Sequence, residues 1–152
     1  MSQMKKIVTW VLVADAGAGQ VYVNEGPGRG LAAVAGGTFE ADPSKGQDVF
    51  SDREGRSFDR VGGGRHAMAP PTSAREQGRE SFAKEMVHWL EAPARAKAFD
   101  RLALVAEPKT LGVLRDALSP ATQKKVVAEL AKDLTKAGAP EIARALGDQI
   151  DV

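Results

Sequence analysis

The sequence predicts an α/β fold in which helices cover the faces of a mixed five-stranded sheet, and three patterns lead to this prediction. Residues 7–14 form an almost continuously apolar run, which is typical of a strand buried on both faces. Residues 20–24 alternate in polarity directly after a glycine-rich turn, which is typical of a β-hairpin. Beyond residue 72, apolar runs of strand length alternate with segments of helical periodicity, which favours parallel strands joined by helical crossovers.

The first strand has to be distinguished from a signal peptide, because Lys5 and Lys6 precede its apolar residues. The run is only eight residues long, and Asp15 follows where a cleavage site would require a small residue. A run of this length is also too short to span a bilayer. We therefore expect a strand at residues 7–14, in a cytoplasmic protein that does not cross a membrane.

A third, weaker strand is expected at residues 31–39, where Gly36 and Gly37 indicate a bulge. The character of the chain then changes, because residues 42–71 contain few large apolar side chains and several glycines and prolines. We expect no regular element there, and we assign residues from about 44 to 71 to one long glycine-rich loop of a single 152-residue domain. Loops of this length in a compact domain usually serve a function or are disordered.

The helix and strand that follow the loop are predicted from start and stop signals and from apolar spacing. Ser73 and Glu76 fit a capping box at the start of a helix, and Pro93 is expected to end it. A buried strand is expected at residues 102–106. The apolar stripe of the helix consists of Phe82, Met86, Trp89 and Leu90.

Two further helices are expected to begin near prolines, Pro108 and Pro140, and the first of them stops at residues 119–120. Residues 124–130 favour a strand, with a helix as the alternative. The first, fourth and fifth strands are then parallel, because helical crossovers join them. The expected buried positions of the two helices are Leu111, Leu114, Leu118, Ile142 and Leu146.

Composition and motif content exclude several classes of function. The chain has 21 basic and 20 acidic residues and a net charge of +1, so any electropositive surface must be local. It has no cysteine, which excludes disulfides and thiolate zinc sites. The two histidines, His66 and His88, lack metal-ligand spacing, and no dinucleotide, phosphate-loop or G-x-S-x-G motif is present. We therefore expect neither a bound metal nor a cofactor, and we expect His88 to be a packed or surface residue of its helix.

The long loop carries the most distinctive motif of the chain, three glycines followed by an arginine and a histidine. Gly62, Gly63 and Gly64 allow backbone conformations closed to other residues and let a partner approach closely. Arg65 adds a permanent cation and His66 a titratable group. The pattern favours a tip that reaches a phosphate or a reaction centre, with a flexible surface loop without a task as the alternative.

Arginines upstream of the glycines alternate with acidic residues. Arg53, Arg56 and Arg60 could contact RNA phosphates. The alternative is a set of local ion pairs on a solvated surface, each of which contributes little. Phe58 is the only ring in this stretch, so the pattern lacks the stacking platform of many RNA-binding proteins.

Asp15 and Glu107 each follow an expected parallel strand, at the edge of the sheet where ligands bind in open α/β folds. Two carboxylates there could hold Mg²⁺ for nuclease chemistry. A turn role for Asp15 and a helix-start role for Glu107 are favoured over this alternative.

Five segments of the chain together carry a family resemblance: WVLVADAG near the start, DREGRSFD and GGGRHA in the loop, then FDRLALVAEPKTLGVLR and KDLTK. Over about residues 7–146, this combination resembles the bacterial host attachment proteins, which are described as required for attachment to host cells. Those proteins are grouped with the bacterial relatives of the archaeal and eukaryotic class-I peptide release factors.

The resemblance implies an RNase-H-like fold that matches the middle domain of the release factors, and a role at the ribosome. It implies that residues 62–66 correspond to the release-factor tip that enters the peptidyl-transferase centre, although no glutamine follows the glycines here. The leading hypothesis is a translation-associated protein that binds the ribosome or tRNA through the loop, with His66 as the base or the water-positioning group if it hydrolyses peptidyl-tRNA. A non-enzymatic regulatory or interaction protein affecting host attachment is the alternative, and a metal-dependent nuclease is the third.

Overall fold

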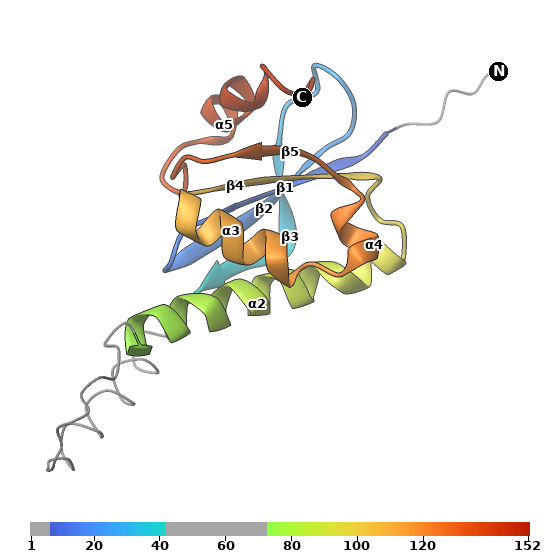
Figure 1. Ribbon diagram of the computed structural model, residues 1–152. Helices are drawn as coiled ribbons and strands as arrows, with labels where there is room; N and C mark the ends of the chain where they lie inside the picture. The colour runs from blue at the N-terminus through green and yellow to red at the C-terminus, as the bar shows by residue number, and fades with distance from the viewer. Residues whose placement is uncertain (1–6, 42–72) are drawn as a thin grey trace, which may run out of the picture.

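A five-stranded sheet forms the centre of the computed structural model, which describes residues 7–41 and 73–152. Its strand order is β3-β2-β1-β4-β5 (Figure 1). The strands are β1 (Thr9–Ala14), β2 (Ala18–Asn24), β3 (Ala32–Glu40), β4 (Arg101–Ala106) and β5 (Val126–Leu130).

Strand direction within this sheet is mixed. β1 pairs in parallel with β4, and β4 in parallel with β5, whereas β2 is antiparallel to both β1 and β3. Therefore β2 alone runs against the other four strands. The arrangement confirms the predicted hairpin, the parallel first, fourth and fifth strands, and the RNase-H-like mixed sheet.

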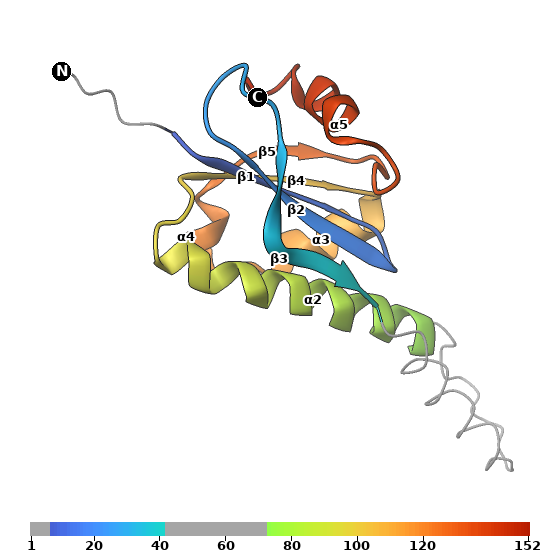
Figure 2. The same ribbon diagram turned by 180° about the vertical axis from the view of Figure 1, so that it is seen from behind.

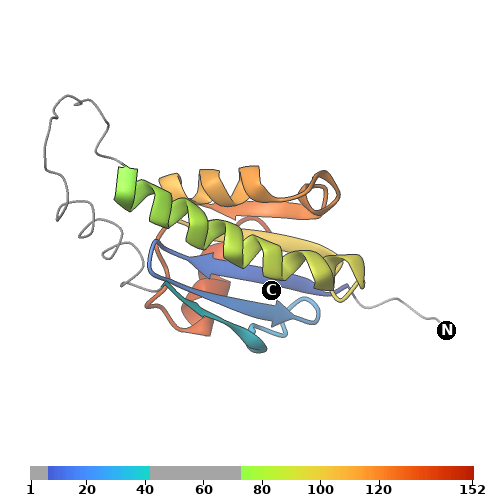
Figure 3. The same cartoon turned by 90° about the horizontal axis from the view of Figure 1, so that it is seen from below.

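Helices cover both faces of the sheet. α2, α3 and α4 lie on one face and α5 lies on the other (Figures 1 and 2). Seen from the helical side, α2 runs across the sheet with α3 beside it (Figure 3). The helices are α2 (Ser73–Arg95), α3 (Pro108–Ala117), α4 (Pro120–Gln123) and α5 (Ala139–Leu146).

The first strand contributes to the cores on both faces, which explains its continuous apolar sequence. Trp10, Leu12 and Ala14 pack on the side of α2 and α3, whereas Val11 and Val13 pack on the side of α5. All six residues of β1 are buried. A strand covered on both faces must be apolar at every position rather than at alternate ones, because each side chain leaves water.

The predicted buried stripe of α2 is confirmed. Phe82, Met86 and Leu90 are buried, and the ring of Trp89 stacks on that of Trp10 with centroids 5.9 Å apart. The predicted buried positions of α3 and α5 are confirmed as well, since all five of these side chains lie in the two cores.

The third strand contains the expected bulge. Tyr22 pairs with Ala33 and Gln20 pairs with Thr38, so β3 carries extra residues between the two pairs. Gly36 lies within them with a φ of 80°, a left-handed conformation that favours glycine.

Two features of the helices differ from the prediction. Pro93 does not end α2, which continues to Arg95 and stops where Lys97 adopts a φ of 60°. Pro93 lacks only its own N–H group, and its carbonyl still accepts a hydrogen bond from Ala98 N (2.9 Å), so the last turn persists. The short helix α4 was not expected either, although the segment after it is a strand, as favoured. The capping hydrogen bond expected for Ser73 falls outside the described side chains.

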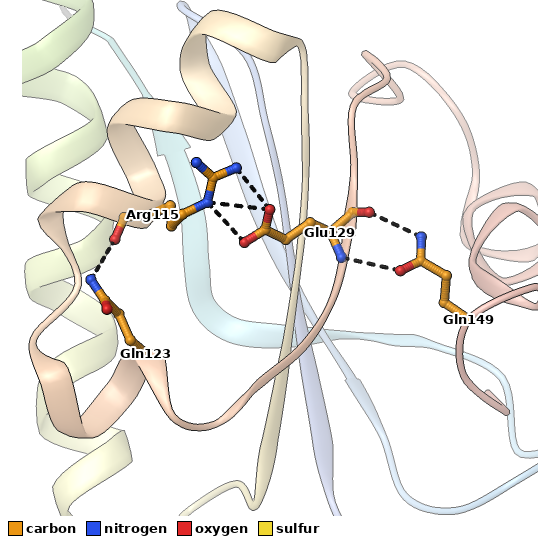
Figure 4. Close-up of polar contacts among 4 residues, drawn as sticks. All are labelled: Arg115, Gln123, Glu129 and Gln149. Carbon is orange, nitrogen blue, oxygen red and sulfur yellow. Dashed lines mark hydrogen bonds and ion pairs between the residues drawn. The ribbon is translucent and has the colours of Figure 1, made fainter.

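The exposed edge of β5 is covered by a side chain from the C-terminal segment (Figure 4). Glu129 N donates to Gln149 Oε1 (3.4 Å), and Gln149 Nε2 donates to Glu129 O (2.9 Å), so the carboxamide occupies the place of a neighbouring strand. Arg115 Nη2 donates to Glu129 Oε1 at 2.8 Å, and this hydrogen bond lowers the pKa of the Glu129 carboxyl. Gln123 Nε2 in turn donates to the carbonyl of Arg115 (3.0 Å). Such coverage protects an edge strand from pairing with another chain.

A carboxylate on α2 joins that helix to the α3–α4 junction. Glu91 Oε2 accepts from Ser119 N (3.0 Å), and Glu91 Oε1 accepts from Ser119 Oγ (2.9 Å) and Thr122 Oγ1 (2.7 Å). Partial burial raises the pKa of Glu91. The hydrogen bonds from Ser119 and Thr122 and the charge of Arg95 lower this pKa by more than burial raises it. The pKa therefore lies below its ordinary value of 4.5.

We predict that Gly19→Ala destabilises the fold by roughly 1–3 kcal/mol, because the added Cβ would collide with the sulfur of the buried Met86. The matched control is Gly78→Ala, at an exposed position of α2 with open space around it. There the loss of backbone freedom in the unfolded chain should stabilise the helix by about 0.5–1 kcal/mol. Urea denaturation measures both changes, and equal stabilities of the two variants would contradict the prediction.

We predict that Glu91→Gln lowers the free energy of unfolding by about 1–2 kcal/mol near neutral pH, because an amide cannot accept all three hydrogen bonds. The folded pKa is below the unfolded one, so the contribution of Glu91 is fully present above about pH 4.5 and is lost as pH falls through the folded pKa. Urea denaturation of both proteins across this pH range should show the difference shrinking toward low pH. A difference that grows on acidification would contradict this assignment.

Candidate functional site

The carboxyl edge of the sheet gathers the features that the sequence singled out. Because β1, β3, β4 and β5 run in one direction, their C-terminal ends lie along the same edge. Asp15 follows β1 and Glu107 follows β4 at this edge. β3 ends there at Glu40, directly before residues 42–72.

The other end of residues 42–72 returns to the same edge, because the start of α2 is paired with the start of α3. Lys109 Nζ lies 3.5 Å from Glu76 Oε2, and Arg79 Nε lies 4.0 Å from Glu107 Oε2. Lys109 and Glu107 directly flank the first residue of α3, which follows the carboxyl end of β4. The segment therefore leaves and re-enters the described fold at one edge of the sheet.

The predicted binding and catalytic residues all belong to residues 42–72 and lie outside the described residues. Their roles stay predictions. They are Arg53, Arg56, Arg60, Gly62, Gly63, Gly64, Arg65 and His66.

Asp15 forms the hydrogen bonds of a turn. Its Oδ1 accepts from the N–H groups of Gly17 and Ala18, each at 2.7 Å, which closes the β1–β2 hairpin. Its Oδ2 accepts from Thr135 Oγ1 at 2.9 Å, which links the hairpin to the connection between β5 and α5. The favoured turn role of Asp15 is therefore confirmed.

Glu107 has the favoured helix-start role. It occupies the N-cap position of α3 with an extended backbone, and its Oε2 accepts from Thr110 Oγ1 at 3.0 Å. The Nε atom of its neighbour Arg79 is buried and has no hydrogen-bond partner among the described residues. At 4.0 Å the pair attracts electrostatically without forming a hydrogen bond.

Within residues 7–41 and 73–152, no group of three or more His, Cys, Asp or Glu side chains is placed to hold a metal ion. His88 is exposed on α2, in agreement with the expectation of a surface or packed helix residue. None of the described helices is both long and apolar enough to span a membrane.

A hollow that sequence reasoning missed lies on the sheet beside the carboxyl edge. Its volume is about 240 Å³, and its polar lining includes Gln20, Tyr22, Thr38, Glu40 and Thr135. Thr38 Oγ1 donates to Gln20 Oε1 at 2.6 Å across the β2–β3 pair. Side chains alternate between the two faces of the sheet along β2, so Gln20 and Tyr22 share one face. The bulge in β3 determines which residues of that strand pair with them.

Solved structures similar to this fold include an archaeal translation termination factor. It matches with a TM-score of 0.51 at 10% sequence identity, over 91% of this chain and 36% of its own. A second archaeal protein matches with a TM-score of 0.45, also at 10% identity, over 91% of this chain and 35% of its own. At such low identity the likeness concerns the fold alone. The chain thus spans little more than a third of either protein.

Sequence comparison identifies a family. No curated protein matches the chain. A family model described as "Protein required for attachment to host cells" matches residues 10–146, which extend from β1 through the last residue of α5 and include residues 42–72. The chain therefore belongs to the family of proteins required for attachment to host cells.

Proposed function

We propose that this protein acts at the ribosome, where residues 42–72 contact ribosomal RNA or tRNA. The observation that carries the proposal is the fold shared with a translation termination factor over 91% of this chain. The family model, which covers residues 10–146, adds the description of a protein required for attachment to host cells. A protein that binds the translation machinery affects attachment indirectly, through the proteins that the cell makes.

In this proposal the loop arginines and the loop glycines make different kinds of contact with the RNA. Arg53, Arg56, Arg60 and Arg65 neutralise phosphates, and Gly62, Gly63 and Gly64 let the backbone approach the RNA closely. Support comes from the two ends of the segment, which meet at the carboxyl edge of the sheet. In open α/β folds ligands bind at this edge, because the connections after parallel strands converge there.

His66 is assigned the chemical step in this proposal. As a base beside the glycine tip, it removes a proton from a water that attacks the ester carbonyl carbon of peptidyl-tRNA. The ester C–O bond breaks with the ribose oxygen of the tRNA as the leaving group, and this oxygen takes the proton from the imidazolium. The peptide is released as a carboxylic acid, which loses its remaining proton to solvent. An unperturbed imidazole changes its charge near neutral pH, which suits a general base.

We predict that the protein pellets with ribosomes at low salt and that the double variant Arg56→Ala/Arg65→Ala pellets less, because two phosphate contacts are lost. Lys84→Ala/Arg144→Ala is the matched control, since it removes the same charge from exposed positions on α2 and α5. Quantitative co-sedimentation across a salt series measures the effect. Absence of wild-type protein from the ribosome pellet at low salt would refute the proposal.

We predict that the protein releases peptide from peptidyl-tRNA and that His66→Ala lowers the rate by about 10²–10⁴-fold, the usual contribution of a general base. Ribosome binding by the variant should remain, because the arginines are intact. Single-turnover release from a labelled peptidyl-tRNA measures the rate. If the wild-type protein binds ribosomes without turnover, the family's attachment phenotype is better explained by a non-enzymatic regulatory role.

A further inference from the structure

Five basic residues meet at the edge of the sheet opposite to residues 42–72, and we call this surface the basic edge. Two of them flank the connection between α2 and β4, one lies within it, and two lie in the connection between α4 and β5. β4 and β5 are parallel neighbours, so both connections end side by side, and Leu102 N donates to Lys125 O at 2.8 Å. The residues of the basic edge are Arg95, Lys97, Arg101, Lys124 and Lys125.

The cations of the basic edge are accessible to a partner. Arg95, Lys97 and Lys124 are exposed, and Arg101 and Lys125 are half-buried. Figures 1 and 2 show the two connections at the same end of the molecule, beside the C-terminal end of α2.

Within the part of the chain that the structure describes, no residue of the basic edge forms an ion pair. The described residues form ion pairs at Arg79, Lys109 and Arg115, none of which belongs to the basic edge. Arg101 donates through Nε to the neutral hydroxyl of Thr9 (2.9 Å), which leaves its charge uncompensated.

Two carboxylates near this edge are already used inside the fold. Asp100 Oδ2 accepts from the backbone of Val8 at 2.8 Å, which joins β1 to the α2–β4 connection. Glu91 attracts Arg95 at longer range, but its oxygens accept hydrogen bonds from Ser119 and Thr122. Both acids are held in place by the fold, but their donors are neutral, so their negative charges offset part of the five positive charges of the basic edge.

The backbone conformation of Lys97 is a second, independent observation, because a lysine at this position costs some stability. It lies two residues after α2 with a φ of 60°, a left-handed conformation that glycine adopts far more easily than lysine. A glycine at this position would relieve the backbone but would remove a charge from the basic edge.

We infer that the basic edge binds the phosphate backbone of a structured RNA. A cluster of lysines and arginines without carboxylate partners attracts a polyanion and gains affinity by releasing its counterions. Among the described residues the exposed large hydrophobic side chains are Ile7, which precedes β1, and Val127 of β5. β4 lies between β1 and β5, so the surface offers charge rather than an apolar patch. The inference rests on the ribosome-directed function proposed above, and it adds a second RNA contact at the opposite end of the sheet.

The test is fluorescence anisotropy with a labelled tRNA transcript over a salt series. Lys124→Gln/Lys125→Gln should weaken binding by roughly three- to tenfold at low salt and flatten the salt dependence by about 0.7–0.9 per lost contact. The matched control is Lys132→Gln/Lys136→Gln, which removes the same charge from exposed positions between β5 and α5 and should bind like the wild type.

A second variant separates binding from folding. Lys97→Gly should raise the melting temperature, because glycine tolerates the left-handed backbone, and should weaken tRNA binding at the same time. A variant that merely unfolds cannot give this pair of results. Unchanged affinity in this variant together with unchanged affinity in Lys124→Gln/Lys125→Gln would overturn the inference.

The remaining outcomes also decide the matter. Wild-type protein without tRNA affinity at low salt overturns the inference, and so does equal displacement of tRNA by polyglutamate of matched charge, which would indicate an acidic protein partner. Ribosome pelleting that depends on Arg56 and Arg65 but is unaffected by the basic-edge variants leaves the proposed function standing and removes only the second contact. Basic-edge dependence of tRNA binding without ribosome pelleting supports the basic edge and refutes the proposed function.

Discussion

The pairing of β1 with β4 is the interaction on which the rest of the structure depends. Both strands are covered on both faces, and their side chains supply the centre of each of the two cores. α2 and α3 pack on one side of this pair and α5 packs on the other. Successive side chains of a strand point to opposite faces of the sheet, so alternate residues of β1 and β4 contact the helices of each side. Burying each large aliphatic side chain contributes about 1.5–3 kcal/mol, so this pair contributes to the stability of both cores.

The parallel direction of that pair also decides at which edges of the sheet the connections meet. Connections after parallel strands meet at the carboxyl edge, and connections before them meet at the amino edge. At the carboxyl edge the described cations of α2 and α3 have acidic partners, as in Lys109 with Glu76. At the amino edge the lysines that precede β5 have no such partner among the described residues. The basic edge therefore differs in this respect from the paired starts of α2 and α3.

Element type was predictable from the sequence wherever local pattern and burial agree. The continuous apolar run of β1 and the prolines that open α3 and α5 determine the structure of the residues next to them in the sequence. Pro93 was misjudged because a proline near the end of a helix loses only one hydrogen bond, and packing of the buried Ala94 maintains the turn. The hollow at the carboxyl edge was missed because it depends on the β2–β3 register, which a bulge shifts.

By itself, the sequence determined the class of fold, the buried stripes, the family and the unusual composition of residues 42–72, because these follow from the order and chemistry of neighbouring residues. Only the tertiary structure decided that Asp15 closes a turn and reaches Thr135, and that both ends of residues 42–72 meet at one edge. It also brought two separate connections together as one basic surface. The physical reason is that β4 and β5 pair in parallel, and strand pairing joins residues whose separation in the sequence carries no local signal.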